Sequence, residues 1–264
     1  MKRGEYQNFV VARLSSIGDI VLTAPVFVAI KEAYPSSRTF LLTKPEYSDI
    51  ARLLPSLDYI IKYSSLLSAI RELRSTGKIV YIDLHSKLKT KLCGIMADTV
   101  YRVTYRKKSL ERWLIPVGVV KKQVTPVYVR YLDTLKKIGI NASYNKEVKL
   151  KEPDGWENVL EKFNLRPRSY ICASPAANYA TKRTPFKLLD EIAGNLNEKI
   201  VLLGGKDVTQ TGRLLKERHN NVIDLTGTPS IYESSSIIYG SKCYIGGDTG
   251  LSHISAGFKI PTII

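Results

Sequence analysis

The chain of 264 residues has few of the residues that build metal centres and disulfide scaffolds. It contains three histidines and three cysteines, and no two cysteines form a C-x-x-C pair. A disulfide-rich domain, a cysteine-based zinc site and a multi-histidine metal centre are therefore disfavoured. A protein of the reducing cytoplasm fits this composition.

Long hydrophobic runs are also missing. No apolar stretch reaches the roughly 18 residues of a membrane-spanning helix, and the longest candidate, Ile20–Ile30, is interrupted by Thr23 and Pro25. Arg13 and Asp19 interrupt any apolar region near the amino terminus, so no secretory signal is expected. The G-x-G-x-x-G, Walker A and D-x-D patterns are absent as well. Their absence disfavours a dinucleotide dehydrogenase, a P-loop NTPase and a metal-bridged nucleotide-sugar site.

What the chain has in excess is positive charge, and the excess is uneven. Residues 1–150 carry 26 basic and 12 acidic side chains, a net of +14, whereas residues 151–264 carry a net of only +2. One interpretation is a lysine-rich solvated surface of a heat-tolerant protein. The other is a surface for an anionic partner, which could be nucleic acid, acidic lipid or a phosphorylated glycolipid.

Apolar runs of strand length alternate with helical patterns along the whole chain. This spacing predicts an α/β fold with parallel sheets covered on both faces. A polar stretch with Pro153 and Gly155, at about 140–155, predicts a linker between two doubly wound domains, 1–150 and 156–264. Helices are expected at 18–34 and 127–138, the second closed by Gly139. The last run, Ile260–Ile264, looks like a strand just beginning, so we expect the second domain to be incomplete.

Ligands of parallel α/β sheets bind beyond the carboxyl ends of the strands, and three loops there are candidates. The first is Ser15–Asp19, which precedes a predicted helix. Gly18 would let the backbone approach a ligand. Asp19 either caps the helix or serves as a general base that takes a proton from a sugar hydroxyl.

The second loop runs from Gly246 to His253 between a predicted strand and helix. The exposed amides of Thr249, Gly250 and Leu251 would form an anion site at the helix amino terminus. Asp248 is an N-cap or a ligand contact. His253 is either structural or a donor to a phosphate.

The third loop runs from Ser174 to Pro185. Lys182 is either a solvated charge or the cation that neutralises a leaving diphosphate. In the loop that follows the next strand, Asp207 is suited to bind a ribose hydroxyl.

Taken together, S-S-I-G-D at 15–19, K-R-T-P at 182–185, the Gly204-Gly205 pair, D-L-H-S at 83–86 and above all D-T-G-L-S-H at 248–253 resemble glycosyltransferase family 9, the lipopolysaccharide heptosyltransferases. The resemblance spans nearly the whole chain. Two features depart from the family: it usually has tryptophan where Thr184 stands, and it continues past Pro261.

The resemblance implies the GT-B architecture, two Rossmann-like domains with the active site in the cleft between them. Residues 1–150 would bind the acceptor and residues 156–264 the donor, and the sugar would be transferred with inversion. Asp19 would be the catalytic base. The donor would contact a set of small, polar and charged residues: Gly18, Asn178, Lys182, Asp207, Asp248, Thr249, Gly250, Leu251 and His253.

The implied function is transfer of heptose from ADP-heptose to the lipopolysaccharide inner core. The donor is a substrate, and no separate cofactor or metal is expected. The anionic acceptor would use the charge of the first domain, with candidate contacts Lys62, Lys87, Arg106 and Arg112. A cytoplasmic enzyme at the inner face of the bacterial inner membrane is expected, without a nucleic-acid partner. The alternatives are another nucleotide-sugar donor, or a non-catalytic α/β protein that binds anions or nucleic acid.

Overall fold

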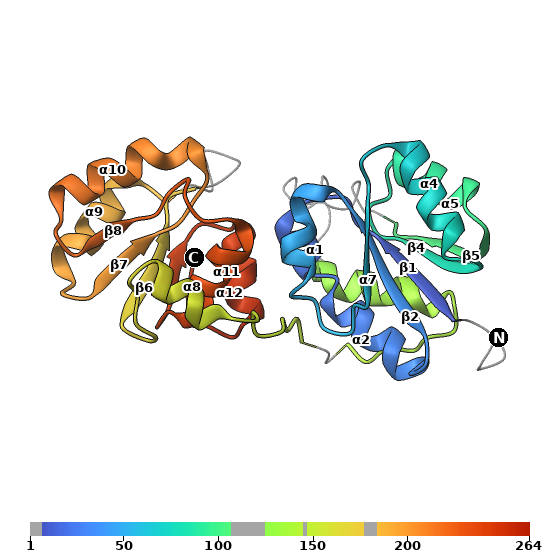
Figure 1. The fold of residues 1–264 in the computed structure, drawn as a ribbon. Coiled ribbons are helices and arrows are strands. Elements are labelled where there is room, and N and C mark those ends of the chain that lie inside the picture. Colours follow the sequence, from blue (N-terminus) through green and yellow to red (C-terminus); the bar gives the residue numbers. More distant parts are fainter. Residues whose placement is uncertain (1–6, 107–124, 145–146, 177–183) are drawn as a thin grey trace, which may run out of the picture. The chain divides into compact units, whose positions relative to one another are not determined.

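The computed structural model describes residues 7–106, 125–144, 147–176 and 184–264. The chain divides into two compact units (Figure 1). The first comprises residues 1–15 and 22–148. The second comprises residues 149–264 and also the short segment Ser16–Val21. The second unit thus takes six residues from within the sequence of the first.

The first unit is built on a five-stranded parallel sheet in the order β3-β2-β1-β4-β5. Its strands are β1 (Asn8–Ala12), β2 (Arg38–Thr43), β3 (Tyr59–Lys62), β4 (Ile79–Asp83) and β5 (Thr99–Thr104). Every residue of β1 and β4 is buried, as expected for central strands covered on both faces. The edge strand β5 is mostly exposed.

Helices cover both faces of this first sheet (Figure 1). On one face, α4 (Leu66–Ser75) packs beside α5 (Leu88–Met96), and buried residues such as Leu73 and Cys93 join the strands in one core. On the other face, α2 (Ala24–Ala33) packs beside α7 (Val127–Lys136). A short turn, η1 (Pro45–Tyr47), and α3 (Ser48–Ala51) connect β2 to β3. Gly139 follows α7 with a φ of 78°, which confirms its predicted role at the helix end.

The helix expected at 18–34 is in fact two helices. The first, α1, spans Ile17–Val21, and α2 begins at Ala24. Pro25 explains the break, because a proline has no N–H for the carbonyl four residues earlier and its ring collides with that carbonyl. The residue four positions before Pro25 is Val21, where α1 ends. The break matters because α1 belongs to the second unit and α2 to the first.

The second unit repeats the topology of the first, with strand order β10-β9-β6-β7-β8. The strands are β6 (Tyr170–Ser174), β7 (Lys199–Leu202), β8 (Val222–Asp224), β9 (Tyr244–Gly246) and β10 (Thr262–Ile263), and all pairs are parallel. In both units the strand order reverses beside the first strand, which is where ligands of open α/β sheets bind.

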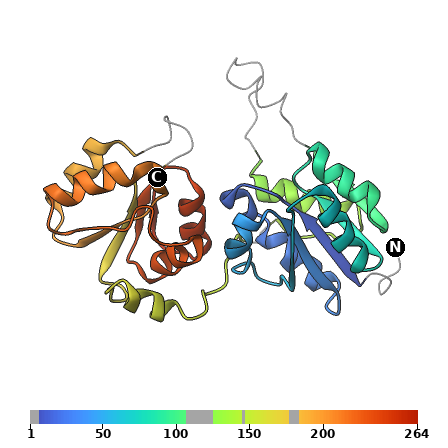
Figure 2. The ribbon, with the colours of Figure 1, turned by 45° about the horizontal axis from the view of Figure 1, so that its top comes forward.

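Helices also cover both faces of the second sheet, as Figure 2 shows. One face carries α9 (Phe186–Asn195) and α10 (Thr209–Arg218), the latter preceded by the turn η3 (Lys206–Val208). The other face carries α8 (Trp156–Lys162), α11 (Ile231–Gly240) and α12 (Gly250–Gly257). The sequence analysis places no helix at α8, whose Trp156 ring packs edge-on against Tyr239 of α11 at 5.2 Å.

Candidate functional site

The loop that follows β9 lies at the point where the strand order of the second sheet reverses. Gly246 ends β9 beside Ser174, the last residue of β6. Thr249 has extended backbone and caps α12, and its N–H donates to Ser252 Oγ at 3.0 Å. The next amides, of Gly250 and Leu251, have no partner inside the helix because they lie in its first turn. This loop therefore presents N–H groups of the kind that bind a phosphate.

Hydroxyl groups lie beneath this loop. A Cβ at Gly246 would come within 2.7 Å of the Tyr244 hydroxyl, so the glycine keeps the loop close to the tyrosine. Burial raises the pKa of Tyr244 to about 12, against the opposing influence of the Thr249 and Ser174 hydroxyls. The Tyr244 and Thr249 hydroxyls are both buried, and the hydroxyls of Thr249 and Ser174 lie close to that of Tyr244. The side chains beneath the loop are therefore polar and uncharged.

His253 lies one turn into α12, and its Nε2 is 3.5 Å from Asp248 Oδ1 at the start of the loop. Both side chains are partly accessible to solvent. The imidazole and the carboxylate therefore flank the first amides of the helix, in reach of a ligand bound there.

The predicted base, Asp19, is the third residue of α1 and is half-buried. Its Oδ2 lies 3.5 Å from the backbone N and 3.3 Å from the Oγ of Ser16, which are long distances for hydrogen bonds. The Ser16 contacts therefore orient the carboxylate only weakly.

Within the second unit, α1 packs directly against α12. A Cβ at Gly18 would lie 2.4 Å from Cδ2 of His253, and a Cβ at Gly250 would lie 2.7 Å from Cβ of Ile17. Glycine is therefore required at both positions, because each lies too close to a side chain of the other helix to leave room for a Cβ. The structure thus brings Gly18, and with it the neighbouring Asp19, to the amino-terminal turn of α12.

The other predicted donor residues lie elsewhere or cannot be placed. Asp207 is exposed in η3, directly after β7. β7 lies two strands from β9, about 10 Å across the sheet, so Asp207 and the α12 loop follow strands on opposite sides of β6. Asn178, Lys182 and the acceptor candidate Arg112 lie outside the described residues.

The remaining acceptor candidates follow three strands of the first sheet. Lys62 ends β3, Lys87 precedes α5 and Arg106 follows β5, and all three are exposed. β3 and β5 are opposite edges of this sheet in the described part of the chain, so Lys62 and Arg106 are far apart. They do not form one cluster.

Two buried charges organise the loops at the carboxyl edge of the first sheet, and the sequence analysis gave neither a role. Asp83 accepts hydrogen bonds from the N–H groups of His85 and Ser86 at 3.0 and 2.8 Å, and burial raises its pKa. Arg13 donates to the carbonyls of Ser15 and Leu84, both at 2.7 Å. The only signal in the sequence is a charge at the end of an apolar strand.

The described residues contain no group of three or more His, Cys, Asp or Glu side chains placed to hold a metal ion. Among the helices of these same residues, none is both long and apolar enough to cross a membrane.

Comparison with solved structures shows what the fold is similar to. A family 9 glycosyltransferase from Veillonella parvula aligns with a TM-score of 0.80 at 17% identity, over 97% of this chain and 80% of that one. The E. coli ADP-heptose lipopolysaccharide heptosyltransferase II aligns with a TM-score of 0.77 at 17% identity, over 97% of this chain and 83% of that one. An E. coli heptosyltransferase solved with ADP aligns with a TM-score of 0.73 at 17% identity, over 97% of this chain and 86% of that one. The expected GT-B fold with two Rossmann-like units is confirmed.

A search of curated protein sequences finds no match. A family model described as glycosyltransferase family 9 (heptosyltransferase) matches residues 66–264, about three quarters of the chain. That range includes the D-L-H-S stretch and the whole loop before α12. With this match, the chain belongs to glycosyltransferase family 9, the heptosyltransferase family.

Proposed function

We propose that this glycosyltransferase moves heptose from ADP-heptose to the anionic inner core of lipopolysaccharide, with inversion at the anomeric carbon. The observation that carries the proposal is the packing of α1 on α12, which brings a carboxylate to the first turn of α12, whose amides have no partner inside the helix, within one unit. Two solved structures of similar fold are named for ADP-heptose or contain ADP.

In the proposed reaction the donor diphosphate binds the amides of Gly250 and Leu251, and His253 donates to a phosphate oxygen. Asp19 takes the proton from the acceptor hydroxyl as its oxygen bonds to the anomeric carbon. The bond from that carbon to the diphosphate oxygen breaks on the opposite side, and ADP leaves with the electron pair. The positive charge on the sugar is greatest in the transition state, where negative charge has already begun to develop on the leaving diphosphate.

Residue roles beyond this centre belong to the same proposal. Asp207 would bind the ribose, and Asn178 and Lys182 would complete the donor site. The first domain would bind the acceptor through Lys87, Arg106 and Arg112, and Lys62 would serve only a long acceptor because it lies at the far edge of the sheet. The donor is a substrate, and the proposal includes no separate cofactor. A cytoplasmic enzyme at the inner membrane surface follows from such an acceptor.

The test is the substitution Asp19→Asn, which keeps the shape of the side chain but removes its ability to accept the proton. Sugar transfer should fall by about 10²–10⁴-fold while ADP binding is retained. Asp154→Asn, an exposed aspartate of the same unit, is the matched control and should keep the wild-type rate. An unchanged rate of sugar transfer in Asp19→Asn would show that Asp19 is not the base.

Donor identity needs a separate measurement. Thermal stabilisation by ADP-, UDP- and GDP-sugars should be greatest with ADP-heptose. Greater stabilisation by a UDP- or GDP-sugar would show that the donor is not ADP-heptose, and the proposed transfer reaction would stand with that other donor. Binding of RNA with a steep salt dependence, without binding of any nucleotide sugar, would favour the non-catalytic alternative.

A further inference from the structure

A basic pocket of about 800 Å³ lies along β5, the edge strand of the first sheet in the described part of the chain. Four cations line it: Lys91 of α5, Arg102 of β5, Arg106, and Lys137 at the end of α7. The described residues that line it include no aspartate or glutamate. In the described part of the chain the pocket therefore gathers four positive charges and no lining carboxylate.

None of these four cations has an ion pair with a described residue, although the charge of Lys91 reaches the buried carboxyl of Asp83 and acts to lower its pKa. Lys136 pairs with Asp133 at 3.0 Å, but its neighbour Lys137 donates to the backbone carbonyl of Thr104 at 3.3 Å. Elsewhere, exposed lysines and arginines such as Lys162 and Arg213 have carboxylate partners. Surface lysines that are merely solvated are commonly interspersed with acids. The four cations that line this pocket repel each other, and a bound anion would relieve that repulsion.

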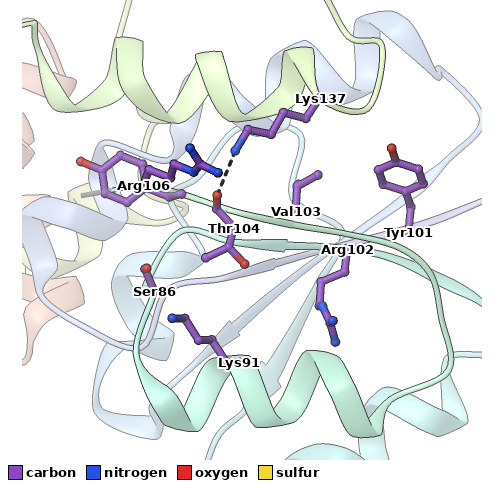
Figure 3. Close-up of a pocket in the computed structure, with 9 residues that line it drawn as sticks. Ser86, Lys91, Tyr101, Arg102, Val103, Thr104, Arg106 and Lys137 are labelled. Carbon is purple, nitrogen blue, oxygen red and sulfur yellow. Dashed lines mark hydrogen bonds between the residues drawn. The ribbon is translucent and has the colours of Figure 1, made fainter. Parts of the chain in front are cut away.

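Figure 3 shows that the cations approach the strand from two sides. Arg106 and Lys137 lie on the side of α7, whereas Lys91 and Arg102 lie on the side of α5. β5 also contributes Tyr101 and Thr104 to the lining of the pocket. A ligand in this pocket would therefore meet charge from both helices and neutral donors from the strand.

The aliphatic part of the Arg102 side chain packs close to α5, and the residue is exposed to solvent. A Cβ at Gly94 of α5 would lie 3.0 Å from Cδ of Arg102 and 2.6 Å from Cδ1 of Tyr81. The glycine thus makes room for the aliphatic part of the arginine beneath the guanidinium. A planar guanidinium can bind two oxygens of a phosphate side by side.

We propose that this pocket is a second anion site, separate from the α12 loop, that binds a phosphate group of a ligand carrying at least two negative charges. The phosphate belongs either to a soluble phosphorylated ligand or to the headgroup of an anionic membrane lipid. The inference does not depend on the proposed sugar transfer, because only Arg106 is shared with the residues named there.

The experiment uses the full chain with saturating ADP, so that the α12 loop is occupied. Inorganic pyrophosphate is titrated by calorimetry, and phosphatidylcholine vesicles with about one third phosphatidylglycerol are used in a sedimentation assay. The variant Arg102→Gln/Lys137→Gln removes one cation from each side of the strand. We expect about fivefold weaker binding per cation removed, which corresponds to about 1 kcal/mol each.

The matched control is Arg71→Gln/Lys78→Gln, which removes the same two residue types from exposed positions of the same unit, outside the pocket. Weaker pyrophosphate binding in the pocket variant alone supports a soluble phosphorylated ligand. Weaker vesicle binding in that variant alone supports a lipid headgroup. An equal loss of pyrophosphate and vesicle binding in the pocket variant and the control variant, or no loss of binding in either, would overturn the proposal.

The single variant Lys137→Gln controls for misfolding, because Lys137 is exposed and its Nζ donates to a backbone carbonyl. This variant should bind the same probe about fivefold more weakly than the wild type, and its melting temperature should be unchanged. Loss of ADP binding in wild type would count against the proposed function and leave the pyrophosphate comparison between variants intact.

Discussion

The packing of α1 on α12 can be tested by placing a single methyl group between them. In Gly18→Ala the new Cβ would lie 2.4 Å from Cδ2 of His253 and 3.0 Å from its Cγ and Nε2, whereas ordinary contacts begin at 3.4 Å. Either the imidazole or α1 must therefore move by about 1 Å. Movement of the ring changes its contact with Asp248, and movement of α1 displaces Asp19.

The expected effect on activity is larger than the effect on stability. Overpacking costs about 1–3 kcal/mol, and alanine recovers up to about 1 kcal/mol as the better helix former. The net loss in unfolding free energy is therefore about 0–2 kcal/mol. A displacement of about 1 Å at a reacting group can lower the rate by about 10²-fold. We expect kcat/KM of sugar transfer to fall by about that factor.

The measurement pairs steady-state transfer kinetics with urea denaturation. Gly194→Ala is the matched control, since a Cβ there meets only His219 Cε1 at 3.5 Å, an ordinary contact. It should be neutral or slightly stabilising. In the double variant Gly18→Ala/His253→Ala the collision is absent, so its unfolding free energy should equal that of His253→Ala or exceed it by up to about 1 kcal/mol. A Gly18→Ala protein with wild-type kcat/KM and stability would refute the close fit.

Two further predictions concern the buried charges of the first unit. Burial raises the pKa of Asp83 above 3.8, so between the unfolded and folded pKa values the native state binds more protons and stability falls as the pH rises. Asp83→Asn should flatten this slope in urea denaturation curves from about pH 4 to pH 7, and an unchanged slope would contradict the assignment. Arg13→Met should cost about 1–3 kcal/mol because the carbonyls of Ser15 and Leu84 lose their donor; an unchanged urea midpoint would show that other groups satisfy them.

Much of the fold follows from local sequence pattern. Strands such as β1 and β4 are buried on both faces, so their apolar runs identify them directly. The helix at 18–34 was predicted as one because its apolar residues continue through Pro25, although proline removes the hydrogen bond that would join the two parts. Helix α8 was missed because seven residues with several charges give a weak periodic signal, and its stability comes from the contact of Trp156 with Tyr239.

The candidate site was predictable only in part. The loop at 246–253 could be found because glycines between a strand and a helix are a local signal. The fit of Gly18 to His253 joins residues more than two hundred positions apart, and no local pattern encodes such a contact. The basic pocket was anticipated only through Arg106. Arg102 and Lys137 come together because α7 packs beside β5, which depends on tertiary structure.

The allocation of Ser16–Val21 to the second unit has a consequence for hybrid proteins made from members of this family. A crossover at 148/149 would join an α1 from one parent to an α12 from the other. Glycine in one helix and imidazole in its neighbour would then have to match by chance. A hybrid that carries residues 16–21 along with 149–264 keeps this inherited pair intact, so the exchangeable module is discontinuous in the gene.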